Sequence, residues 1–274
     1  MVGDKLNELL CLEARLADVA RALRQHVRAL DAPVVGALHL MCADESEWEC
    51  GAALQRHFIN DLLPDLKFGT KSPFRLLNLG GRYEPGALAV AEHHFTTPET
   101  RSAFKVLLVK VNAHVAVDGL GAQALFGHMQ RYDSESTVCG ALHALLKGGE
   151  QPFLNDLRTT FNEGQDRLAA LLDDNLVEAR YRSLFVALVN ARLQTRRVEQ
   201  EIAKHEPASP THYLVASCVT LNRPEEDTEL LCGLYTADTR DASTEYRGLG
   251  DDPTKYKVLF EGSRLRVRDD HLTD

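Results

Sequence analysis

Three residues far apart in the chain, Cys42, His114 and Asp133, have the types needed for catalysis by a nucleophilic thiol. Cys42 follows a predicted strand and precedes a predicted helix, a setting in which amide donors and the helix dipole favour a thiolate. His114 is the candidate general base, and Asp133 is the candidate group that orients its imidazole. The sequence therefore suggests a thiol-dependent acyl-transfer or hydrolytic enzyme with Cys42 as the nucleophile.

Two further polar side chains are candidates for binding a small-molecule or peptide substrate. Arg82 follows two glycines in a predicted loop, and Asn112 shares the strand of His114. Either side chain could polarise a substrate carbonyl. An ordinary turn in which Arg82 pairs with Glu84 explains the same loop equally well. In its order of Cys, His and Asp, the chain resembles papain-like and transglutaminase-like thiol enzymes.

A second interpretation comes from the string His114-Val115-Ala116-Val117-Asp118-Gly119. It matches the pattern H-x-x-x-D-G and resembles the active-site motif of the CoA-dependent acyltransferase and condensation-domain families. The resemblance implies that His114 is a general base towards an acceptor hydroxyl or amine, and that Asp118 is structural. The alternative is structural throughout, because Asp-Gly often closes a hairpin.

The remaining thiols give weaker hypotheses. Cys139 and His143 are four residues apart and share one face of a predicted helix, with Cys139 in its first turn if Ser136 is the N-cap. The apolar residues around Cys139 favour a buried structural role instead. The chain has no C-x-x-C pair and no H-E-x-x-H motif. We therefore expect reduced thiols, no metal and no cofactor.

The elements that must position these residues follow from hydrophobic periodicity. Strands are predicted for the segment ending near Cys42 and for residues 104–117, and Asp118-Gly119 predicts a hairpin whose return strand lies within 124–132. A helix is predicted from 177 to about 205. Two strands around the turn at 222–228 form a second predicted hairpin, in which Cys218 faces Cys232.

These elements predict an α+β fold, with a predominantly helical body around a short sheet and a C-terminal antiparallel β element. We expect one compact domain over 1–274, with a helical N-terminal segment at 5–30 and a β-rich segment at 211–274. The helix at 5–30 carries one narrow apolar stripe, which serves packing within the domain or pairing between two subunits. A non-catalytic interaction or assembly protein that dimerises through this helix is therefore the competing class.

Composition limits the partners. The 274 residues are 44% hydrophobic and carry a net charge of −9. Such a surface repels the phosphates of nucleic acids and anionic membranes. The sequence contains no run of about 18 to 20 apolar residues, and its N-terminus has no secretory leader pattern. We therefore expect a cytoplasmic protein that binds neither nucleic acid nor membrane.

Overall fold

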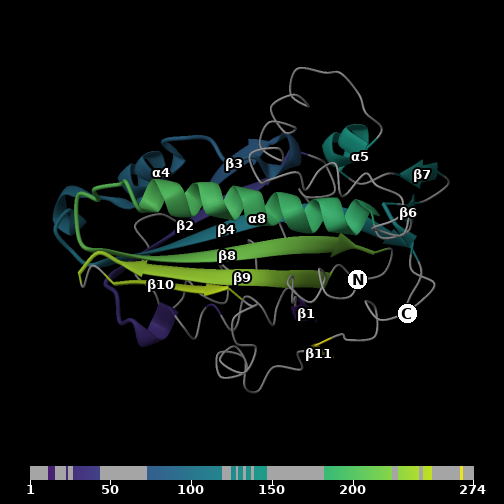
Figure 1. The fold of residues 1–274 in the computed structure, drawn as a ribbon. Coiled ribbons are helices and arrows are strands. Elements are labelled where there is room, and N and C mark those ends of the chain that lie inside the picture. Colours follow the sequence, from purple (N-terminus) through teal and green to yellow (C-terminus); the bar gives the residue numbers. More distant parts are fainter. Residues whose placement is uncertain are drawn as a thin grey trace.

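In the computed structural model, the fold is built around one large sheet (Figure 1). The described residues are 12–15, 23, 27–43, 73–118, 125–127, 129–131, 134–136, 139–146, 182–223, 228–240, 243–248 and 266–267. The strands of the sheet are β1 (Leu12–Arg15), β2 (Val34–Cys42), β3 (Phe74–Asn78), β4 (Lys105–Asp118), β5 (Leu125–Phe126), β8 (Thr211–Asn222), β9 (Thr228–Asp238), β10 (Ser243–Gly248) and β11 (Arg266–Val267). Seven of these strands follow the order β11-β1-β9-β8-β4-β2-β3, while β10 pairs with β9 and β5 pairs with β4.

The central part of the sheet is parallel. Strand β2 pairs in parallel with β3 and β4, and β4 pairs in parallel with β8. Residues 105–117 of β4 and all residues of β8 are buried, so both faces of these strands are covered. Parallel strands covered on both faces are typically long and apolar, as this pair is. Parallel strands also share one carboxyl edge, which is where Cys42 lies.

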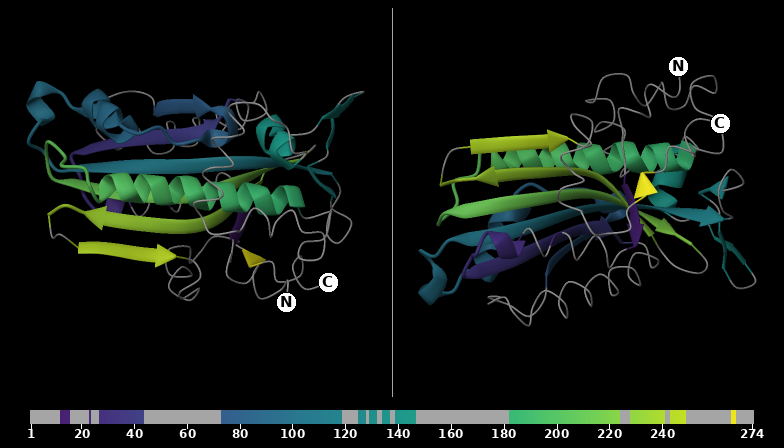
Figure 2. Two further views of the ribbon diagram at one scale, coloured as in Figure 1. Left: turned by 45° about the horizontal axis from the view of Figure 1, so that its top comes forward. Right: turned by 90° about the horizontal axis from the view of Figure 1, so that it is seen from below.

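In the described part of the chain, three helices lie on one face of this sheet: α4 (Ala87–Phe95), α5 (Gly140–Leu146) and α8 (Arg182–Ile202). Helix α8 runs along β4 and β8, and Figure 2 shows it beside strands that continue from β3 at one edge to β10 at the other. Two apolar clusters join the layers. One contains residues of α4 and the C-terminal half of α8, and the other contains residues of α5 and the N-terminal half of α8.

The prediction of a helical body around a short sheet is wrong. The structure is dominated by a large, mainly parallel central sheet with antiparallel strands at one side. Within the segment expected to be a helix at 5–30, residues Leu12–Arg15 form strand β1 and pair with both β9 and β11. The physical reason is tertiary pairing. Backbone hydrogen bonds to the edge of β9 stabilise the strand more than local helix propensity stabilises a helix. Dimerisation through this segment stays a prediction.

Several strands and the long helix occur where the sequence predicts them. Strands β2, β4, β8 and β9 and helix α8 lie within or close to the predicted ranges. The return strand after β4 is confirmed only as β5, which pairs antiparallel with Val117 and Asp118. The main neighbours of β4 are the parallel strands β2 and β8 instead. Among the described residues, no helix is long and apolar enough to cross a membrane.

The pairing of β8 with β9 follows the predicted register from His212 to Ser217 and differs from it by one residue from Cys218 to Leu221. Cys218 lies opposite Leu231, while Ser217 lies opposite Gly233, so Cys232 is the extra residue of a bulge. A bulge inserts one extra residue into a strand and shifts the register beyond it. The predicted juxtaposition of Cys218 and Cys232 is therefore wrong.

Candidate metal centre

Cys42 is the last residue of β2, at the carboxyl edge of the parallel strands. Its side chain is buried in the apolar cluster that α5 and α8 form with the sheet. The amide of Gly80 donates a hydrogen bond to Cys42 Sγ across 3.2 Å. A hydrogen-bond donor aimed at sulfur favours the thiolate over the thiol. The sequence-based expectation of amide donors near this thiol is met by the turn after β3, whereas the helix predicted after Cys42 lies outside the described residues.

His114 lies on β4 and is fully buried, with 0% of its surface exposed. Its Nδ1 is 3.1 Å from Oδ1 of Asn222, the last residue of β8. Because an amide oxygen can only accept, this contact places the proton of a neutral ring on Nδ1 and the lone pair on Nε2. Asn222 thus holds the ring in the orientation and tautomer that a metal-binding imidazole requires.

Cys139 lies directly before α5 and is 1% exposed. The sequence predicts Cys139 within the first turn of a helix, but the helix begins one residue later and Cys139 has a left-handed backbone with φ of 56°. Its carbonyl oxygen accepts a hydrogen bond from the amide of His143. This hydrogen bond joins two backbone groups. The side chain of Cys139 lies with those of Cys42 and His114.

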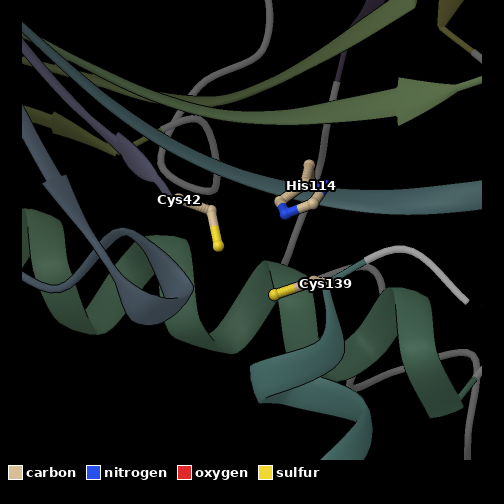
Figure 3. Close-up of side chains that lie close together, drawn as sticks. All are labelled: Cys42, His114 and Cys139. Carbon is tan, nitrogen blue, oxygen red and sulfur yellow. The ribbon is translucent and has the colours of Figure 1, made fainter. Parts of the chain in front are cut away.

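The side chains of Cys42, His114 and Cys139 converge from three separate elements (Figure 3). The two sulfur atoms and an imidazole nitrogen all lie within 4.8 Å of one another. All three residues are buried, so this cluster is enclosed by the sheet, α5 and α8. A sequence separation of 97 residues between the two cysteines hides this convergence from any analysis of local spacing.

This donor set fits a zinc ion. Zinc binds thiolate sulfur and imidazole nitrogen with tetrahedral geometry, in which two coordinated sulfurs are about 3.8 Å apart. The observed upper limit of 4.8 Å is close enough for small side-chain rotations to reach that geometry. Two thiolates also neutralise the charge of a divalent cation, which a buried site requires. Soft thiolate ligands disfavour magnesium and calcium, which prefer oxygen.

The turn that carries Gly80 is held against the sheet by its glycines. The 3₁₀ turn η2 (Leu79–Gly81) has Gly80 at φ 71° and Gly81 at φ 69°. A Cβ on Gly81 would come within 2.5 Å of the backbone oxygen of Asn112, two residues before His114. Only a residue without a side chain allows the turn to approach β4 this closely.

The structure describes four of the five residues proposed from sequence, and the cluster of donor atoms contains two of them. Cys42 and His114 meet, as the thiol hypothesis requires, while Asp133 lies outside the described residues. Arg82 forms an ion pair with Glu84, as the ordinary-turn interpretation expects.

The amide of Asn112 exchanges hydrogen bonds of 3.0 and 3.2 Å with the hydroxyl of Thr220 on β8. This neighbour on β8 orients the amide. Roles of Arg82 and Asn112 towards a substrate stay predictions.

Sequence reasoning missed the relation of Cys139 to the other two donors. It considered Cys139 with His143, because residues four apart on a helix were the only partners that spacing could suggest. Burial of Cys139 was predicted and is confirmed. The parallel pairing of β2 with β4 brings Cys42 and His114 together, and Cys139 reaches them from the residue before α5.

The arrangement defines a class first: an α/β protein with a mainly parallel sheet and a buried cysteine–histidine cluster. The sequence matches no protein-family model and no curated protein. Among solved structures, the chain is similar to PtLCIB4, a homolog of the limiting CO2-inducible protein LCIB, with a TM-score of 0.60 and 13% identity over 86% of this chain and 94% of that chain. It is also similar to LCIB, with a TM-score of 0.53 and 16% identity over 86% of this chain and 94% of that one. The chain therefore has the fold of these proteins.

Proposed function

We propose that Cys42, His114 and Cys139 bind one zinc ion and that the resulting centre hydrates carbon dioxide. The observation that carries this proposal is the convergence of two thiols and one imidazole within 4.8 Å. With three protein ligands, zinc retains a fourth position for water and lowers the pKa of that water to about 7. The proposal replaces the expectation that the protein needs no metal.

The protein contributes ligand orientation and exclusion of solvent. Asn222 holds the ring of His114, and Gly80 donates to the sulfur of Cys42. The three donor residues are between 0 and 3% exposed. Such an enclosed site favours a substrate that is small and neutral, because a bulky molecule would have to displace packed side chains and a charged one would lose its hydration. Carbon dioxide meets both conditions, and the shared fold with limiting CO2-inducible proteins supports this choice.

The competing function is the thiol-dependent acyl transfer or hydrolysis expected from sequence. The proximity of Cys42 to His114 favours it, since a thiol and a base must lie together in such an enzyme. Against it, a second thiol shares the imidazole, and the surroundings are packed and apolar. The two functions differ in their need for Cys139, which is essential as a zinc ligand and dispensable for a Cys42–His114 pair.

The test measures zinc content and carbon dioxide hydration for the wild type, Cys42→Ser, His114→Ala and Cys139→Ser. Metal is determined by mass spectrometry after dialysis, and hydration is followed by stopped flow with a pH indicator. We expect one zinc per wild-type chain. For each variant we expect loss of hydration and a loss of affinity that exceeds the roughly 10- to 100-fold effect of removing a group that only orients a ligand. Cys218→Ser is the matched control, because Cys218 is equally buried but lies on β8 outside the cluster.

Three results would contradict the proposal. Absence of stoichiometric zinc in the wild type removes the metal centre. Full zinc binding by Cys139→Ser removes the assigned ligand set. Stoichiometric zinc without any hydration of carbon dioxide leaves the centre but removes the substrate. Thioester or peptide hydrolysis that needs Cys42 and His114 but survives Cys139→Ser establishes the competing function.

A further inference from the structure

We propose that Asn190 of α8 is a positioning residue for the metal centre, because it fixes the turn whose amide donates to Cys42. This inference rests on the proposed zinc site and goes beyond its three ligands. Asn190 is 1% exposed, and its Nδ2 donates to the backbone oxygen of Gly80 across 2.6 Å. The amide of the same Gly80 donates to Cys42 Sγ across 3.2 Å. Asn190 therefore controls a contact to a ligand without touching the ligand.

A second amide side chain holds Asn190 in place. Gln194 lies one helical turn further along α8 and is completely buried. Its Nε2 donates to Oδ1 of Asn190 across 3.1 Å, and its Oε1 accepts from the backbone amide of Tyr83 across 2.9 Å. Residues four apart project from the same face of a helix, so the two amides form one continuous strip towards the turn. Helix α8 is thus hydrogen-bonded to the turn at Gly80 and to the backbone just after the turn at Tyr83.

The opposite side of the turn is fixed by the sheet. A side chain at Gly81 would collide with the backbone oxygen of Asn112, and the nearest backbone nitrogen beyond it belongs to Cys42. The turn is therefore held between the end of β2, the middle of β4 and the amide strip of α8. A displacement of Gly80 would lengthen the contact from its amide to sulfur, and the bond from Asn190 restrains Gly80 directly.

The chemistry of the strip points to a role in the site. Buried amides are costly unless every polar atom is satisfied, and the rest of this helix face is apolar, including Ala187, Ala191 and Val198. A donor to a metal-bound thiolate reduces the charge on sulfur and orients it. Groups that orient metal ligands in this way typically contribute 10- to 100-fold to metal affinity.

The test compares Asn190→Leu with Thr195→Val on the same helix. Leucine keeps the approximate volume of asparagine but cannot donate to Gly80. Thr195 is also buried, and its hydroxyl bonds only within the helix, to the backbone oxygen of Ala191. The two variants therefore both lose a buried hydrogen bond, but only Asn190→Leu releases the turn.

Zinc affinity is measured by competition with a chromophoric chelator, and the thiolate-to-metal charge-transfer band is recorded after cobalt substitution. We expect Asn190→Leu to weaken zinc binding by about 10- to 100-fold and to shift the cobalt band. We expect Thr195→Val to remain within about twofold of the wild type, with an unchanged band. Urea unfolding of the metal-free proteins provides the measure of general stability.

Unchanged affinity and band in Asn190→Leu would overturn the positioning role, as would equal weakening in both variants. If Asn190→Leu does not fold, Gln194→Met takes its place, and we expect it to lower zinc affinity several-fold. An unchanged affinity in Gln194→Met would then contradict the inference. Failure of the wild type to bind zinc would instead overturn the proposed metal centre itself. The wild-type measurement therefore separates the two failures.

Discussion

Replacing Gly81 with alanine tests how closely the turn η2 is held against the sheet. Gly81 has a φ of 69°, and a new Cβ would lie 2.5 Å from the backbone oxygen of Asn112. Ordinary contact begins at 3.4 Å, so the turn has to move by about 0.9 Å. The oxygen belongs to a central buried strand and cannot move away easily. The turn therefore moves instead, away from β4.

The cost has two parts. An alanine in the left-handed region costs about 1 to 2 kcal/mol. Moving the turn also weakens the hydrogen bonds of Gly80 to Cys42 and to Asn190, each worth about 1 kcal/mol. We therefore expect Gly81→Ala to lower the free energy of unfolding by about 3 to 4 kcal/mol.

Gly86→Ala is the matched control. Gly86 also has a positive φ, of 87°, but a Cβ there meets nothing within 4 Å. Its expected cost is the backbone part alone, about 1 to 2 kcal/mol. Urea unfolding of the metal-free proteins measures the difference. Equal destabilisation by the two substitutions would refute the close approach of the turn to β4.

Three further outcomes follow from buried groups. Burial, and then the charges of Lys110 and Arg75, lower the pKa of His39 from 6.5 to about 3. The folded protein therefore keeps this ring neutral, and its free energy of unfolding falls as the pH drops below 6.5. The loss in free energy of unfolding is about 2 kcal/mol by pH 5, and His39→Leu should remove this loss. If urea unfolding shows the same pH dependence for His39→Leu as for the wild type between pH 6.5 and 5, the assignment of a lowered pKa to His39 is wrong. Burial raises the pKa of Glu199 from 4.5 to about 7, so the wild type loses free energy of unfolding as the pH rises through 7. After allowance for solvent screening, Glu199→Gln should raise the free energy of unfolding by about 1 to 2 kcal/mol more at pH 8 than at pH 4. An equal effect of Glu199→Gln at both pH values would show that the carboxylate is well solvated. Diamide treatment of the metal-free protein should form a disulfide between Cys42 and Cys139, detected as a cross-linked peptide by mass spectrometry. Bound zinc should prevent this disulfide. Reaction at Cys232 alone would contradict the proximity of Cys42 and Cys139.

Local patterns were enough to predict the elements that carry the site. The long apolar runs of β2, β4 and β8 and the helical periodicity of α8 are properties of single segments, and each appears in the structure. Sheet order is a property of several segments together. Lys110, Asn112 and His114 share one face of β4, and all three are buried. A central strand covered on both faces explains this burial, and its parallel neighbours cannot be read from its own sequence.

The site was predictable in part for the same reason. Cys42 and His114 could be chosen by residue type and by their position on strands. Their contact with Cys139 depends on a parallel crossover and on the backbone conformation just before α5, neither of which has a local signature. The contribution of Asn190 was still less accessible, because a polar residue on an apolar helix face gains meaning only once the opposing turn is known.

Burial of the three donor residues has a kinetic consequence. Because each of these residues is only 0 to 3% exposed, a zinc ion bound between them as proposed would be shielded from solvent. Its release would require a transient separation of the turn, the strands and the helix, and the frequency of that opening would set the rate. Extraction by a chelator should then become independent of chelator concentration, and the ion would be retained for far longer than its equilibrium affinity alone implies.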